Sequence, residues 1–301
     1  MSRVSASLPL ASLLLAGVFT SGFTEGGEKD TTLDTREETT GPEHGKLSTA
    51  DATPVEPGHF ELEPSYAATI VRREWDDRRH LARKCRARIH DLSLSLTAGV
   101  GKDVDLKAAW GLTDEFRRTP AALARDADEP CHGKGMREVD LGARWRFHQS
   151  SRYSLELAYL ASASLPVGEH GSRNRLGVCQ EFWSLNQSVV ATKDWARWTA
   201  NAELGYALPF GEKREDARGT LSANLAAGRQ IVRWLQPEAE LNYAREFLRG
   251  RRNDSDVLAA TVGLVMPVND SVRVNAGVQQ GLWGRNADRA TTFMVAVKFA
   301  W

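Results

Sequence analysis

Apolar and polar residues alternate along most of the chain from residue 59 to the C-terminus. Successive side chains of a β-strand point to opposite faces, so this alternation predicts strands with one apolar and one polar face. The last segment is the most regular, with Phe293, Val295, Val297, Phe299 and Trp301 at every second position. The pattern occurs in segments 60–70, 92–100, 104–112, 139–147, 153–159, 198–208, 221–227, 237–243, 272–278 and 293–301, and less regularly in 176–190 and 257–268. We therefore predict about twelve strands, an even number within the range of bacterial barrels.

The connections between these segments indicate which face is inside. A β-sandwich or a lipocalin-like barrel also alternates, but its apolar face points inward. Here short turns such as 101–103 and 148–151 alternate with long polar connections such as 72–88 and 114–137. Outer-membrane barrels have short periplasmic turns and longer extracellular loops. The predicted fold class is all-β: a transmembrane antiparallel up-and-down β-barrel of the outer-membrane type.

Two segments precede the predicted barrel, which spans residues 57–301. Residues 1–22 contain Arg3 and the apolar run Leu8–Phe19, a pattern typical of a secretory signal peptide. That run is shorter than the roughly 20 residues of a membrane-spanning helix. Residues 23–56 are polar and acidic without periodicity, so we expect a flexible extension. The expected location is the bacterial outer membrane, reached by export.

Charge and motifs exclude several classes of function. Lys+Arg and Asp+Glu each number 39, so the formal net charge is zero and a nucleic-acid partner is not expected. The chain has no GxSxG, HExxH or P-loop motif, and no metal or cofactor site is predicted. His90 and Asp91 would point to opposite faces of a strand and cannot share a catalytic site. No catalytic residue is predicted, and we expect the protein not to be an enzyme.

The polar face of the strands supplies the candidate functional residues. The candidate lumen-lining residues are Glu61, Glu63, Asp105, Lys107, Asp140, Arg144, Arg146, Glu156, Glu203, Glu238, Glu240, Arg273 and Lys298. One interpretation is a pore lining that selects polar or charged solutes. The other is that these side chains pair across strands and fill a narrow lumen. Since closure brings the first strand beside the last, Glu61 or Glu63 is expected to meet Lys298.

Further predictions concern the outside of the barrel and its partners. Cys85 and Cys131 fall in the first two long loops, where export permits a disulfide between them, although free thiols fit the sequence equally well. The arginine-rich stretch 245–252 is a candidate for binding lipopolysaccharide phosphates. We also expect contact with outer-membrane lipids and a small-molecule solute. The terminal residues 293–301, ending on an aromatic, resemble the signal read by the barrel-assembly machinery.

The segment Val55–Glu63 (VEPGHFELE) resembles the opening strand of a family of outer-membrane barrels named for the meta-pathway of phenol degradation. Segments Gly111–Asp114, Asp140–Trp145 and Leu165–Gly168 add to the resemblance, as does the Phe-x-Trp end. The Arg-Pro-Asp that commonly precedes the opening strand in that family is missing here. The resemblance implies transport of hydrophobic or aromatic compounds and supplies no catalytic residues.

Three functions therefore follow from the sequence, in decreasing order of support. The first is an outer-membrane channel or transporter for small molecules. The second is a structural or surface-binding barrel with a filled lumen, whose outer loops carry the function. The third, an outer-membrane hydrolase, lacks a convincing set of a histidine and a nucleophile.

Overall fold

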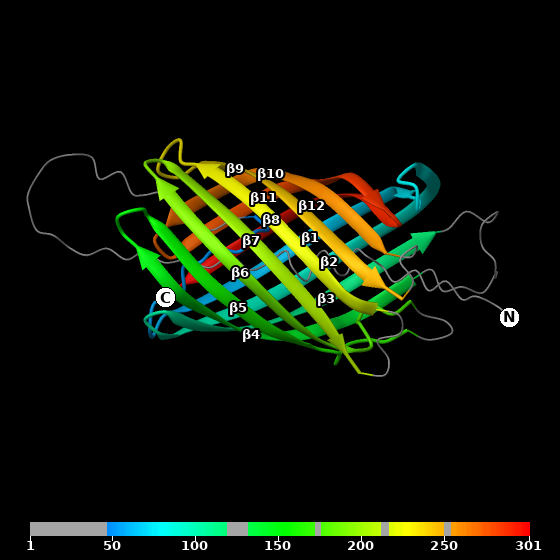
Figure 1. Cartoon of the computed structure of the whole chain (residues 1–301), viewed down its shortest axis with the longest axis horizontal. Coiled ribbons are helices and arrows are strands. Elements are labelled where there is room, and N and C mark those ends of the chain that lie inside the picture. The colour runs from blue at the N-terminus through cyan, green and yellow to red at the C-terminus, as the bar shows by residue number, and fades with distance from the viewer. Residues whose placement is uncertain (1–46, 119–131, 172–175, 212–216, 250–253) are drawn as a thin grey trace, which may run out of the picture.

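The computed structural model describes residues 47–118, 132–171, 176–211, 217–249 and 254–301. Over these ranges the chain forms a closed barrel of twelve antiparallel strands, in which each strand pairs with its neighbours in sequence and β1 pairs with β12 (Figure 1). The strands are β1 (Phe60–Trp75), β2 (Leu81–Gly101), β3 (Val104–Arg118), β4 (His132–Ser150), β5 (Leu155–Leu165), β6 (Trp183–Trp195), β7 (Trp198–Phe210), β8 (Ala217–Arg229), β9 (Gln236–Leu248), β10 (Ser255–Asn269), β11 (Val272–Arg285) and β12 (Ala287–Ala300). The predicted fold class is confirmed. Within the described ranges, no helix is long and apolar enough to cross a membrane.

The apolar face of the strands points outward. Leu204 and Val262 are 59% and 60% exposed, whereas Asp105 on the opposite face is 2% exposed. A water-soluble barrel would show the reverse, because burial of apolar area drives its folding. Trp75 is an exception: it is 5% exposed and packs with Val257 and Ala287. The outer surface is thus suited to lipid, and the inner wall is mainly polar.

The two ends of the barrel differ. At the end that carries the C-terminus, the connections 102–103, 196–197 and 270–271 are tight turns (Figure 1, left). Phe60 and Trp301 exchange backbone hydrogen bonds of 2.9 and 3.1 Å at the same end. We call this the turn end and the opposite end the loop end.

At the loop end, some of the predicted long connections are mostly strand. The predicted connection 72–88 shrinks to 76–80, and β11 and β12 are joined by Asn286 alone. The apolar alternation stops before these extensions, but the backbone ladder continues. Alternation reports contact with lipid, whereas pairing of the backbone does not require apolar side chains.

The sequence predicted a less regular strand over 176–190, but β6 begins only at Trp183, and the connection before it packs on β4. The amide of Glu169 donates to the Met136 carbonyl at 2.8 Å, and the amide of Leu176 donates to the His132 carbonyl at 3.0 Å. A Cβ added to Gly133 would lie 2.4 Å from the Leu176 carbonyl oxygen, so the close approach depends on that glycine. Cys179 is buried in this connection and is a free thiol.

Candidate functional site

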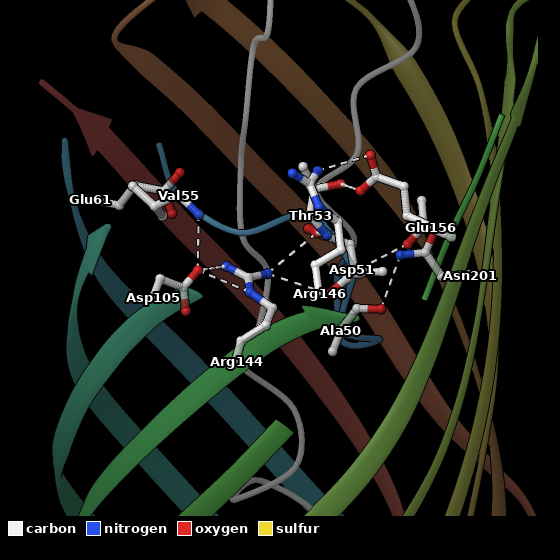
Figure 2. A network of polar contacts seen from close by, with 12 residues as sticks. Ala50, Asp51, Thr53, Val55, Glu61, Asp105, Arg144, Arg146, Glu156 and Asn201 are labelled. Atoms are coloured by element: carbon white, nitrogen blue, oxygen red, sulfur yellow. Dashed lines mark hydrogen bonds and ion pairs between the residues drawn. The ribbon is translucent and has the colours of Figure 1, made fainter. Parts of the chain in front are cut away.

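The lumen contains the chain that precedes β1. Residues 47–55 are all buried, although Ser48, Thr49, Asp51 and Thr53 are polar. Figure 2 shows Ala50, Asp51, Thr53 and Val55 among polar side chains of the wall. We call residues 47–56 the lumen segment. It is followed by Gly58, whose φ of 82° turns the chain toward β1. The sequence predicted a flexible extension up to residue 56, but the described part of it is packed inside the barrel; residues 1–46, including the predicted signal peptide, lie outside the described ranges.

Side chains of the wall bind the backbone of the lumen segment. Glu240 on β9 accepts hydrogen bonds from the amides of Leu47 and Ser48 at 2.8 and 3.0 Å. Farther along, the amide of Ala52 donates to Thr192 Oγ1 on β6 at 2.8 Å, and that of Val55 donates to Asp105 Oδ2 on β3 at 2.9 Å. The segment thus follows the inner wall from β9 back to β3.

The middle of the lumen segment is held from β7. Asn201 Nδ2 donates to the Ala50 carbonyl at 2.9 Å, and the Ala50 amide donates to Glu203 Oε2 at 3.3 Å. Among the described hydrogen bonds, those of residues 47–55 to the wall all involve a side chain. Backbone-to-backbone hydrogen bonding with the barrel begins at Gly58, whose amide donates to the Gly99 carbonyl. The lumen segment is therefore bound to the barrel without being a strand of it.

Two arginines of β4 tie the segment to the turn end. Arg144 forms an ion pair with Asp105 and lies 3.4 Å from Asp51 Oδ1 of the segment (Figure 2). Arg146 binds Glu156 at 3.1 Å, and Glu156 in turn accepts a hydrogen bond from Thr53 Oγ1 at 2.9 Å. These charges pair with each other and with the segment at the same time.

Apolar contacts and glycines complete the fit. Ala50 and Ala52 pack with Ala158 and Val190 of the wall. A Cβ on Gly99 would lie only 1.9 Å from the carbonyl oxygen of Glu56, so no larger residue is compatible with the path of the segment at this point.

Other predicted lumen residues lie on the inner wall, and most of them are buried. Lys298 Nζ lies 3.0 Å from Glu61 Oε2, which confirms the predicted pairing of the last strand with the first. Asp140 accepts a hydrogen bond from the Ser164 hydroxyl. Glu238 and Arg273 are also buried. All the candidate residues thus lie on the inner face, and several of them contact the lumen segment.

Sequence reasoning missed Asp51, Thr192 and Asn201, which complete the contacts to the segment. Thr192 and Asn201 are ordinary polar positions on a strand and carry no distinguishing signal. The segment itself carries one: Ser48–Thr53 (STADAT) consists of small residues between an acidic stretch and the first strand. Small side chains fit a narrow lumen.

Some predictions fall outside the described residues. Cys131 and the side chain of Cys85 are among them, so their disulfide stays a prediction. Binding of lipopolysaccharide by the stretch 245–252 also stays a prediction, because residues 250–252 are not described. Over the part of the chain that is described, no group of three histidine, cysteine or acidic side chains is arranged to hold a metal ion. His90 Nδ1 lies 2.7 Å from the Tyr66 hydroxyl, and His90 shares the outward register of Leu92.

No family model matches the chain, and no curated protein matches it in sequence. Among solved structures, the barrel is similar to an outer membrane channel from Pseudomonas putida F1, with a TM-score of 0.70 and 10% identity over 85% of this chain and 100% of that one. It is also similar to the beta domain of the Bordetella autotransporter Brka, with a TM-score of 0.51 and 13% identity over 81% of this chain and 100% of that one. At these identities the likeness establishes the fold, a barrel of the type found in outer-membrane proteins.

Proposed function

We propose that the protein is an outer-membrane channel for small molecules and that the lumen segment closes its resting state. The observation that carries this proposal is the way the segment is held. Its amides and side chains bind wall side chains such as Glu240, Thr192 and Asp105, while the strand ladder around it is complete. The segment can therefore leave its place without the loss of any strand pairing.

Displacement of the segment would expose a charged wall. Glu240, Glu203 and Asp105 would lose amide donors, and water or a polar solute would have to replace them. The family resemblance implies hydrophobic or aromatic solutes. A solute that passes this wall must also satisfy charged groups, so we propose aromatic compounds with a polar or ionised substituent as the substrate class.

The second candidate function is a barrel with a permanently filled lumen. The buried network of Arg144, Asp105 and Asp51 favours it, because such a network stabilises only when its members remain together. In that case the lumen segment is a structural part of the core, and it does not move.

Conductance in planar bilayers distinguishes the two. We expect few openings from the intact protein and a larger, frequent conductance from a variant that lacks residues 47–55. A deletion of equal length at residues 30–38 is the matched control and should behave like the intact protein. Flux of benzoate and of a neutral sugar into liposomes then tests the proposed substrate class.

Folding and location are checked first. The barrel should migrate differently on a gel before and after boiling, and the expressed protein should fractionate with the outer membrane. A folded 47–55 deletion that stays silent in bilayers would refute the channel, whereas an intact protein that never opens beside a conducting deletion would support the filled barrel. A soluble periplasmic protein without a heat shift would refute both.

A further inference from the structure

A cluster of arginines lies on the outer surface near the loop end. We infer that Arg72, Arg73, Arg86, Arg88 and Arg289 form a binding site for the phosphorylated headgroup of an outer-leaflet lipid. We call these five residues the arginine patch. They belong to the neighbouring strands β1, β2 and β12, and all are exposed. The inference concerns the lipid-facing surface and does not depend on the lumen.

Strand pairing brings the members of the patch together. Arg73 is directly opposite Arg289 in the register of β1 and β12. Arg88 is directly opposite Ile70 of β1, and Ile70 lies two residues before Arg72 in the sequence. A bulge of β1 between Val71 and Arg73 leaves both Arg72 and Arg73 exposed. Side chains at such cross-strand and diagonal positions are within reach of one ligand.

The patch begins where the lipid-facing apolar surface ends. Toward the turn end, the outward positions of the three strands are mainly apolar over 60–70, 92–100 and 293–301. Each run has about the ten residues that a tilted strand needs to cross the hydrocarbon layer. The next outward positions toward the loop end include Arg72, Arg88 and Arg289. The arginines therefore lie at the level of the lipid headgroups, on the side that faces outward in barrels with short periplasmic turns.

No carboxylate neutralises the patch among the residues that the structure describes. Nearby arginines differ: Arg117 lies 2.9 Å from Asp288, and Arg285 lies 3.3 Å from Asp256. Asp114, opposite His90 on the outer face, is itself bound by His132 at 2.9 Å and Lys134 at 3.6 Å. A group of unneutralised guanidinium groups at a membrane surface calls for an anionic partner.

Phosphate monoesters on a lipid suit this site. A guanidinium group binds phosphate through two parallel hydrogen bonds, and several arginines together can surround a doubly charged group. A lipid also offers acyl chains to the apolar surface beside the patch, which free phosphate does not. Bisphosphorylated lipid A has both features and is the appropriate probe.

The test compares lipid A binding by two charge-matched variants of the full chain, purified and folded in detergent. One carries Arg72→Gln, Arg86→Gln, Arg88→Gln and Arg289→Gln. The control carries Arg152→Gln, Arg197→Gln, Arg229→Gln and Arg233→Gln, four exposed arginines at the turn end. Each arginine near a charged lipid surface changes the binding constant by about tenfold or less. We therefore expect lipid A to bind the first variant at least about tenfold more weakly than the intact protein. For the control variant, the loss of affinity should be less than about twofold.

Two further probes identify the ligand. Lipid A without its phosphates should bind the intact protein and both variants equally weakly. Inorganic phosphate at equal concentration should not compete, because it lacks acyl chains. Binding unchanged by the patch substitutions, equal loss in the control, or equal affinity for dephosphorylated lipid would overturn the proposal, and competition by free phosphate would overturn the lipid assignment.

The gel shift on boiling shows whether each variant is folded. If the patch variant does not fold, the salt dependence of binding is measured with the intact protein. Its affinity for lipid A should fall as the salt concentration rises, whereas its affinity for dephosphorylated lipid A should not. An affinity for lipid A that is independent of salt would contradict the site. None of these assays measures conductance, so the result is independent of the channel proposal.

Discussion

Lys298 Nζ of the last strand lies 3.0 Å from Glu61 Oε2 and 3.9 Å from Glu63 Oε2 of the first strand. Lys298 is 3% exposed and both glutamates are 4% exposed, so the seam of the barrel contains a buried ion cluster as well as the β1–β12 ladder. Both ends of the barrel sequence thus contribute charge to the same point of the inner wall.

This cluster leads to a prediction for Lys298→Met. Removal of the cation leaves the two buried carboxylates with less positive charge to balance them. We expect this to destabilise the barrel by about 3 kcal/mol. The readout is the temperature at which the folded gel band converts to the unfolded one. Lys298→Arg, which keeps the charge, should retain most of the stability. A conversion temperature that is equal in Lys298→Met and the intact protein would show that the pair contributes nothing.

Glu240 accepts the hydrogen bonds from the amides of Leu47 and Ser48 at the start of the lumen segment. Glu240→Ala should therefore weaken the binding of the segment to the wall. Loss of hydrogen bonds to a charged acceptor is expected to raise the open-to-closed ratio in bilayers by about tenfold or more. Glu246→Ala is the matched control, because Glu246 lies on the same strand and is buried but accepts a hydrogen bond from Ser255 of the wall. If the two variants have the same open-to-closed ratio, Glu240 has no role in gating.

Gly99 sets the closest approach between wall and segment. A side chain at this position would clash with the Glu56 carbonyl, so Gly99→Val should displace the segment and expose the bond before Val55 to thermolysin. At Gly101 the nearest atom to an added Cβ is 3.9 Å away, so Gly101→Val is the matched control. Peptide masses after brief proteolysis give the result. Protection of Val55 in Gly99→Val would contradict the described path.

The thiol of Cys179 is expected to be unreactive in the folded protein. Burial raises its pKa to about 11, from an ordinary value of 9.0. The nucleophile is the thiolate, and at pH 8 the raised pKa lowers the thiolate fraction about a hundredfold. In a Cys85→Ser, Cys131→Ser background, maleimide labelling should be slow, increase with pH and become fast after boiling. Rapid labelling of the folded form at pH 7 would show that the connection between β5 and β6, which contains Cys179, opens to solvent.

Much of the fold follows from side-chain alternation. The periodicity that places Phe293, Val295 and Phe299 on one face also places Lys298 on the other, and closure then predicts its partner. Once the apolar face is known to point outward, lumen residues such as Asp105, Arg144 and Glu240 are assigned to the inner face. The lengths of the connections indicated that direction, because outer-membrane barrels have short turns at one end and long loops at the other.

The role of those residues was not accessible from the same pattern. Alternation specifies a face but says nothing about what occupies the space beyond it, so the binding of Val55 by Asp105 and of Asp51 by Arg144 could not be predicted. The extension of β1 and β2 toward the loop end was missed for a related reason. Charged positions such as Arg72 and Arg88 resemble a loop in composition, although their backbones continue the ladder.

The path of the lumen segment has a consequence for the order of assembly. Leu47 contacts Glu240 across 193 positions of the sequence, whereas Val55 contacts Asp105 across 50. Contacts of such long range form late, because the intervening chain must first be ordered. The segment precedes every strand in the sequence, yet its binding partners lie as far along the chain as β9. The binding site for the segment is therefore complete only when the wall from β3 to β9 has formed.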